Sequence, residues 1–200
     1  FNRKATVGLS GSFGTVELGR NYTAYDSLRG ATNNTVDTNM AVTNDVWAAG
    51  TGYETATVTV GGTEYKKGAV VKARDYANRV NNSVRFDSNT YGGFSGSIAY
   101  AFGENKATGL DSTDTLSLHV KYANGPAMAA VTYNAVSVGN AADLKVSHLR
   151  VGGSYNFGMA SVRALFDLAR ADNFGGNKVT QAVYGFGATF NVTPASKLLG

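Results

Sequence analysis

Alternation of apolar and polar residues with a period of two is the feature that most restricts how this chain can fold. It is clear in the stretch RVNNSVRFDS, residues 79–88, where Val84 and Phe86 occupy one set of alternate positions and Arg79 and Arg85 occupy the other. Successive side chains of a β-strand point to opposite faces of its sheet. The stretch therefore predicts a strand with one apolar side and one charged side.

Similar runs recur along the chain with turn residues between them, which predicts an all-β, antiparallel fold. The nine predicted strands cover residues 3–10, 15–22, 79–88, 94–102, 114–123, 126–136, 147–157, 160–170 and 180–192. Most of these runs match the roughly 9–11 residues with which a tilted strand crosses a bilayer, whereas strands of globular proteins usually have about five or six. The connections alternate between short turns and longer segments near 103–113, 137–146 and 171–179, as in a barrel with tight turns at one rim.

Residues 23–78 break this rhythm. Apart from a short β-like stretch at Thr55 to Val60, they show neither strand nor helix periodicity. A segment of this length is too long for a plain connection, and such loops are usually functional or disordered.

Composition and charge exclude several other classes of protein. The longest apolar run, Ala127 to Val131, is far shorter than the roughly 20 residues of a membrane-spanning helix. The formal net charge of +4 comes from scattered lysines and arginines, so we expect no nucleic-acid partner. The chain has no cysteine and only 2 histidines, so we expect no structural metal site, although loop carboxylates could hold Ca²⁺ weakly.

The predicted strands divide their side chains between an apolar face and a face with recurring charge. The second face carries Lys4, Glu17, Arg79, Arg85, Asp87, His119, Lys121, His148, Arg150, Arg163 and Asp167. With histidine neutral, six cations against three anions give this face a charge of +3. The pattern alone also permits a soluble sandwich in which the apolar faces of two sheets pack together.

Five segments in order add a resemblance: NRKATVGLSGSFGTVELGRN, YDSLRG, NRVNNSVRFDSNTYGGFSGSIAYAFGENK, KYANGP and GGSYNFGMASVRALFDLARADN. Together they resemble a general porin of the Gram-negative outer membrane, of the β-proteobacterial and Neisseria type. The resemblance implies a homotrimer of sixteen-stranded transmembrane β-barrels, in contact with the lipid bilayer and lipopolysaccharide, whose third external loop folds into the lumen. Residues 1–200 would be a single barrel segment with about strands four to twelve. Because nine strands cannot close an even-stranded barrel, we expect a longer molecule.

The resemblance also implies roles for individual residues. The cations of the pore constriction would be Arg3 or its neighbour Lys4, together with Arg79, and Arg85 would lie further along the same wall. The inward loop would cover residues 21–78, and its acids would be Asp26, Asp37, Asp45 and Glu54. Other charges that line the lumen would be Glu17, Lys121, Arg150, Arg163 and Asp167.

A porin conducts small hydrophilic solutes and ions by passive diffusion and needs no cofactor. The excess of cations predicts a moderate anion preference that weakens as salt screens the wall. A small closed outer-membrane barrel that acts as an adhesin or anchor remains an alternative, and it predicts no conductance. We expect no enzymatic activity, because His119 and His148 are isolated and no GxSxG motif is present.

Overall fold

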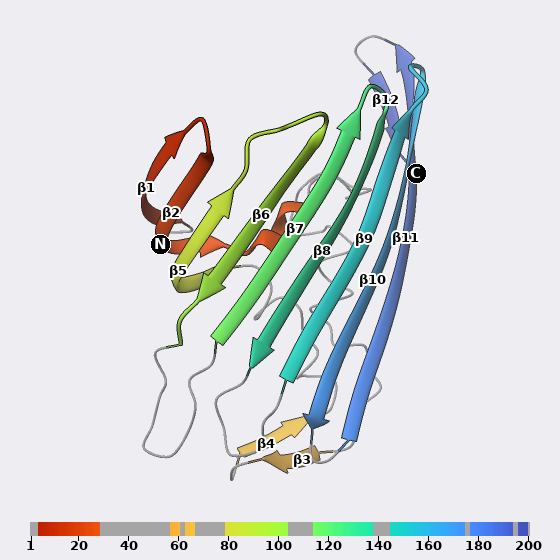
Figure 1. Ribbon diagram of the computed structural model, residues 1–200. Coiled ribbons are helices and arrows are strands. Elements are labelled where there is room, and N and C mark those ends of the chain that lie inside the picture. Colours follow the sequence, from red (N-terminus) through yellow and green to blue (C-terminus); the bar gives the residue numbers. More distant parts are fainter. Residues whose placement is uncertain are drawn as a thin grey trace.

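The computed structural model describes residues 4–28, 57–60, 63–66, 79–103, 114–137, 145–174, 177–193 and 196–199. Their main element is a ten-stranded antiparallel sheet in the order β1-β2-β5-β6-β7-β8-β9-β10-β11-β12 (Figure 1). Its strands are β1 (Ala5–Gly11), β2 (Gly14–Tyr22), β5 (Arg79–Asp87), β6 (Phe94–Ala101), β7 (Asp114–Asn124), β8 (Ala127–Ser137), β9 (Lys145–Asn156), β10 (Ala160–Phe174), β11 (Asn177–Thr193) and β12 (Ser196–Leu199). The remaining elements are a separate hairpin of β3 (Thr57–Val60) and β4 (Thr63–Lys66), and a short 3₁₀ helix, η1 (Ala24–Leu28).

All nine predicted strands are present, with two differences. The prediction of a long connection over 171–179 is wrong, because β10 continues to Phe174 and β11 begins at Asn177. In this extension Ala171 pairs with Val179, and Lys178 forms an ion pair with Asp172 at 3.4 Å. Two short strands were not predicted: β12, which pairs with β11, and β4, which pairs with β3.

Tight turns join neighbouring strands at one end of the sheet, for example β1 to β2 and β7 to β8 (Figure 1). At the β1–β2 turn, Gly14 has a φ of +124°, a conformation that L side chains rarely adopt. A Cβ at this position would lie 2.3 Å from the carbonyl oxygen of Asp87 in β5. Gly14 therefore lets the β1–β2 turn pack directly against the end of β5.

One face of the sheet is apolar and exposed over most of its strands. Leu9 and Phe186, near opposite edges, are both 76% exposed. In the middle of the sheet, Val120 pairs with Val131 and Val131 pairs with Val151, and all three are also exposed. A soluble sandwich would bury this face against a second sheet, so the exposure contradicts that alternative.

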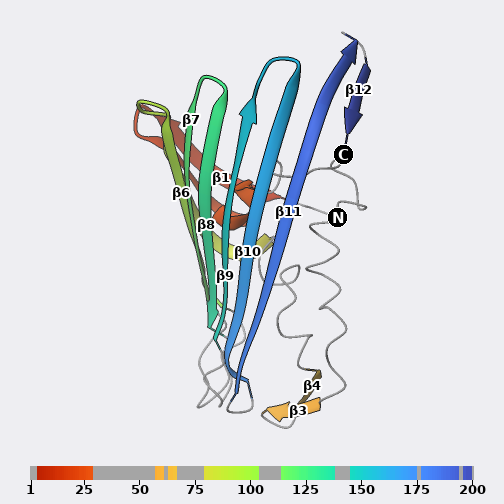
Figure 2. The same ribbon diagram turned by 90° about the vertical axis from the view of Figure 1, so that its right-hand side faces the viewer.

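The sheet is curved, so that β1 and the β11–β12 edge both bend to the same side of the central strands (Figure 2). The polar face lies on this concave side and is called the inner face below. The helix η1 packs on it against β6, β7, β8 and β9, and Tyr25 and Leu28 of η1 are buried there. Within the described ranges, no helix has the length and apolar character needed to cross a membrane.

Candidate functional site

The inner face carries a continuous row of polar side chains across seven strands. Residues that pair directly across an antiparallel sheet lie on the same face, so the strand register traces this row. In order from β2 to β10, the polar row consists of Thr15, Asp87, Ser97, His119, Thr132, Arg150 and Asp167. The next row, further from the tight turns, consists of Glu17, Arg85, Ala99, Ser117, Asn134, His148 and Ala169.

Arg85 connects the wall to the segment that follows β2. Its guanidinium donates to both carboxylate oxygens of Asp87, at 2.7 and 2.6 Å. It also donates to the backbone carbonyls of Tyr22 and Thr23 and to the hydroxyl of Ser27, each at 3.0 Å. The Arg85 side chain is only 12% exposed. The planar, forked donor set of arginine can satisfy all these acceptors at once, which the single ammonium of lysine cannot do with the same geometry.

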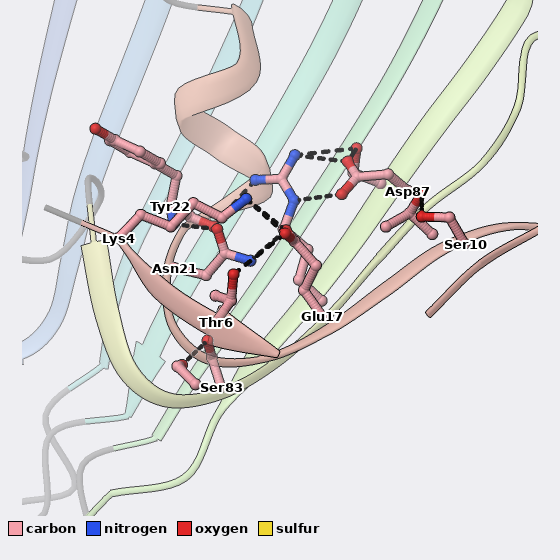
Figure 3. Close-up of polar contacts among 12 residues, drawn as sticks. Lys4, Thr6, Ser10, Glu17, Asn21, Tyr22, Ser83 and Asp87 are labelled. Carbon is pink, nitrogen blue, oxygen red and sulfur yellow. Dashed lines mark hydrogen bonds and ion pairs between the residues drawn. The ribbon is translucent and has the colours of Figure 1, made fainter. Parts of the chain in front are cut away.

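A second charged group lies beside Arg85, where β1 meets β2. Lys4 donates to Glu17 at 2.7 Å, and Asn21 and Thr6 donate to the same carboxylate at 2.8 and 3.3 Å (Figure 3). An open pocket of about 260 Å³ lies between this group, η1 and β5. Its lining consists of Lys4, Glu17, Asn21, Tyr22, Asp26, Ser27, Arg85 and Asp87.

A buried cluster holds η1 to the other side of the wall. The Tyr25 hydroxyl lies 2.9 and 2.7 Å from the two carboxylate oxygens of Asp167, and the backbone N–H of Tyr25 donates to Ser117 at 2.7 Å. Arg150 donates to Asp167 at 2.7 Å, and its guanidinium lies 4.7 Å from the centre of the Tyr25 ring. The side chains of Asp167 and Arg150 are 0% and 6% exposed. The Asp167 charge is thus paired with Arg150 where water cannot stabilise it.

The state of the Tyr25 hydroxyl follows from this environment. Burial is the main cause that raises the pKa of Tyr25 well above its ordinary value, and the negative charge of Asp167 adds to it. The hydroxyl therefore keeps its proton and donates a hydrogen bond to the carboxylate. Both the ring and the hydroxyl of Tyr25 are used in anchoring the segment after β2.

A β-bulge interrupts the alternation of faces that was predicted for β5. Gly19 pairs with Ser83, but Asn21 pairs with Val80, so β5 contains one residue more than β2 over this stretch. Asn82 has a φ of 45°, the left-handed region that asparagine tolerates better than most residues. The single charged face predicted from Arg79 to Asp87 is therefore interrupted. Arg79 pairs with Tyr22 instead, with its guanidinium 5.6 Å from the ring centre.

The remaining predicted site residues are distributed as follows. Lys121 and Arg163 lie on the inner face, opposite Ser95 and Gly187 respectively. Asp26 lies in η1 and lines the pocket beside Arg85. Arg3, Asp37, Asp45 and Glu54, and most of the predicted inward loop, lie outside the described residues.

The structure brings in residues that the sequence reasoning had not assigned to a site: Tyr25, Ser117, Asn21 and Ser97. Ser97 and Ser117 occupy inner-face positions of their strands, so alternation could have found them. Tyr25 opens the YDSLRG segment that supported the resemblance, but only its neighbour Asp26 was selected. No periodicity marks a loop residue such as Tyr25 as buried.

The arrangement suits a polar wall better than a catalytic or metal centre. Ser117, the serine closest to His119 on β7, accepts the Tyr25 amide. Among the described residues, no three His, Asp or Glu side chains gather in a way that could hold a metal ion. What the inner face offers is a set of ion pairs and hydroxyls on a curved surface, opposite an apolar outer face.

Comparisons with known proteins agree with this architecture. The sequence model of the family described as Gram-negative porin matches residues 1–199. Outer membrane porin protein 32 of Delftia acidovorans is 31% identical over 200 aligned residues, which cover 94% of this chain and 50% of the relative. An anion-selective porin from Comamonas acidovorans has the same fold, with a TM-score of 0.75 at 23% identity, over 98% of this chain and 55% of that chain.

The chain thus spans about half the length of the relatives that it matches. The predicted all-β porin fold is confirmed by the family match and by the structural likeness, and the outer-membrane location is confirmed by the family match and the curated relative. A location in this membrane also explains why the convex face of the sheet is apolar, since lipid is its solvent. On the strength of a family match over nearly its whole length, this chain belongs to the family of Gram-negative porins.

Proposed function

We propose that this chain forms part of the wall of a passive diffusion channel for small hydrophilic solutes and ions. The observation that carries the proposal is the division of one curved sheet into an exposed apolar convex face and an inner face with polar rows across seven strands. A transmembrane barrel with a water-filled lumen requires this division. Passage through such a lumen needs no covalent step and no cofactor, and it agrees better with the family than catalysis does.

We propose a moderate preference for anions. The chain carries a formal net charge of +4, and its inner face has more cations than anions. One relative of the same fold is an anion-selective porin. Positive side chains in a low-dielectric wall lower the energy of a passing anion and raise that of a cation.

We further propose that the segment over 21–78 narrows the lumen. Its described start, from Thr23 to Leu28, lies on the inner face and is fastened to β5, β7 and β10 by Arg85, Ser117 and Asp167. These three contacts would hold the first part of such a segment against the wall. The proposed assembly is a homotrimer in the outer membrane, with lipid and lipopolysaccharide around the apolar face.

Planar-bilayer recording of the full-length protein tests the function. We expect discrete, stable current steps and a reversal potential in a KCl gradient that indicates preference for chloride. A small closed barrel acting as an adhesin or anchor would insert without such steps. That result would refute the channel, and steps with a preference for potassium would refute only the proposed anion preference.

A further inference from the structure

Most inner-face cations of the described wall are neutralised by a carboxylate at contact distance. Lys4 is paired with Glu17 at 2.6 Å, Arg85 with Asp87 at 2.6 Å, and Arg150 with Asp167 at 2.6 Å. A contact ion pair has a field that falls off much faster than that of a single charge, so a mobile ion in the lumen feels little of it. The number of cations on the face therefore overstates the positive field.

Lys121 differs from these cations. It lies on the inner face of β7, opposite Ser95 of β6 and Ala130 of β8, which are both uncharged. It is half-buried, and within the described ranges its ammonium forms neither an ion pair nor a hydrogen bond. The next inner-face residue along β7 is His119, which adds no negative charge. Lys121 thus lies on the wall, one row from the polar row towards the tight turns, with no acidic partner among the described residues.

We propose that Lys121 is a specificity-determining residue of the channel and supplies the anion preference of this part of the wall, while Arg85 and Arg150 mainly position the segment after β2. The proposal rests on the channel function proposed above. An uncompensated charge in a low-dielectric wall concentrates its field in the lumen and raises the local concentration of counter-ions. The anchoring arginines have their donors committed to Asp87, Asp167 and the backbone of the inward segment.

The expected size of the effect follows from Coulomb's law. For an ion that passes at about 8 Å in water, one positive charge favours an anion and disfavours a cation by roughly twofold each, before screening. At 0.1 M salt the Debye length is about 10 Å, and at 0.01 M it is about 30 Å. Removal of the Lys121 charge should therefore lower the chloride-to-potassium permeability ratio by roughly two- to fourfold, with the larger change at low salt.

The test compares three substitutions in the full-length protein by reversal potential. Lys121→Gln removes the charge, and Lys121→Arg keeps it. Lys145→Gln is the matched control, because it removes the same charge from an exposed position at the start of β9. The expected result is a lowered ratio in Lys121→Gln, with the wild-type ratio in the other two variants.

A cysteine variant keeps the proposal testable if Lys121→Gln inserts poorly. The chain has no cysteine of its own, so in this part of the protein Lys121→Cys adds a unique thiol that is labelled after channels have inserted. A cationic methanethiosulfonate reagent should raise the chloride-to-potassium ratio, and an anionic one should lower it. Equal ratios in wild type, Lys121→Gln and Lys145→Gln, or labelled channels without a shift, would overturn the role of Lys121. A wild-type protein without current steps would overturn the channel function itself.

Discussion

Replacement of Tyr25 by phenylalanine should loosen the inward segment without unfolding the sheet. The Tyr25 hydroxyl donates to Asp167, and the shorter of its two contacts with the carboxylate oxygens is 2.7 Å. The Asp167 side chain is 0% exposed. A hydrogen bond to a charged group contributes about 1.5–3 kcal/mol. At 1.4 kcal/mol per factor of ten, its loss should raise the population of the detached segment roughly 10- to 150-fold. Asp167 keeps its ion pair with Arg150, so the wall retains its charge balance.

Hydrogen exchange of the protein in lipid vesicles measures this change. The Tyr25 amide, which donates to Ser117, reports whether η1 is in place. Segments of low local stability open while the rest of the fold remains intact, so exchange over 24–28 should accelerate while that of β7 to β10 stays as in the wild type. Tyr22→Phe is the matched control, because the Tyr22 hydroxyl forms no hydrogen bond with the described residues, and its ring contact with Arg79 survives the change. Exchange over 24–28 that is equal in Tyr25→Phe and the wild type would refute the anchoring role of the Tyr25 hydroxyl.

Three further perturbations test other parts of the structure. Val131→Arg places a charge on the exposed apolar face and should lower the free energy of unfolding in lipid by about 2–4 kcal/mol, measured by urea titration. The control Val131→Leu should have little effect, and a Val131→Arg protein as stable as the wild type would argue against lipid contact. Gly14→Ala should cost about 1–3 kcal/mol in the same assay because of its positive φ, and an unchanged urea midpoint would contradict the close turn packing. Arg85→Lys should speed exchange over 23–28 roughly tenfold while the reversal potential stays near that of the wild type, and the reverse pattern would show that Arg85 selects ions rather than positions the segment.

The strands were predictable because a membrane barrel imposes period two on each strand. Each crossing must show apolar side chains to lipid and polar ones to the lumen, so the positions of Val120 and Lys121 on opposite faces of β7 follow from the sequence alone. The bulge in β5 was not predictable in the same way. Asn81 and Asn82 fit either face. The register with β2 shows that β5 has one extra residue here, and the positive φ of Asn82 places the bulge at that residue.

The candidate site was predictable as a face but not as a set of contacts. Parity placed Arg150 and Asp167 on the inner face, yet their contact depends on the register between β9 and β10, which the turn at 157–159 sets. Burial of Tyr25 depends on a loop that returns to β10, more than a hundred residues later in the chain. Such long-range contacts leave no local pattern in the sequence, because they depend on how distant strands are placed in the fold and not on neighbouring residues.

Pairing of the wall charges also means that a count of cations overstates the positive field of the wall. A buried charge such as that of Arg150 is strongly destabilising without a partner. Charged side chains buried between η1 and the wall must therefore form ion pairs. A charge that faces the lumen has no such requirement, since water solvates it. Residues that hold the inward segment are therefore buried and paired, whereas residues that act on passing ions face the lumen without a partner. Lys121, half-buried and without an acidic partner in the described wall, meets the second condition, whereas Arg85 meets the first.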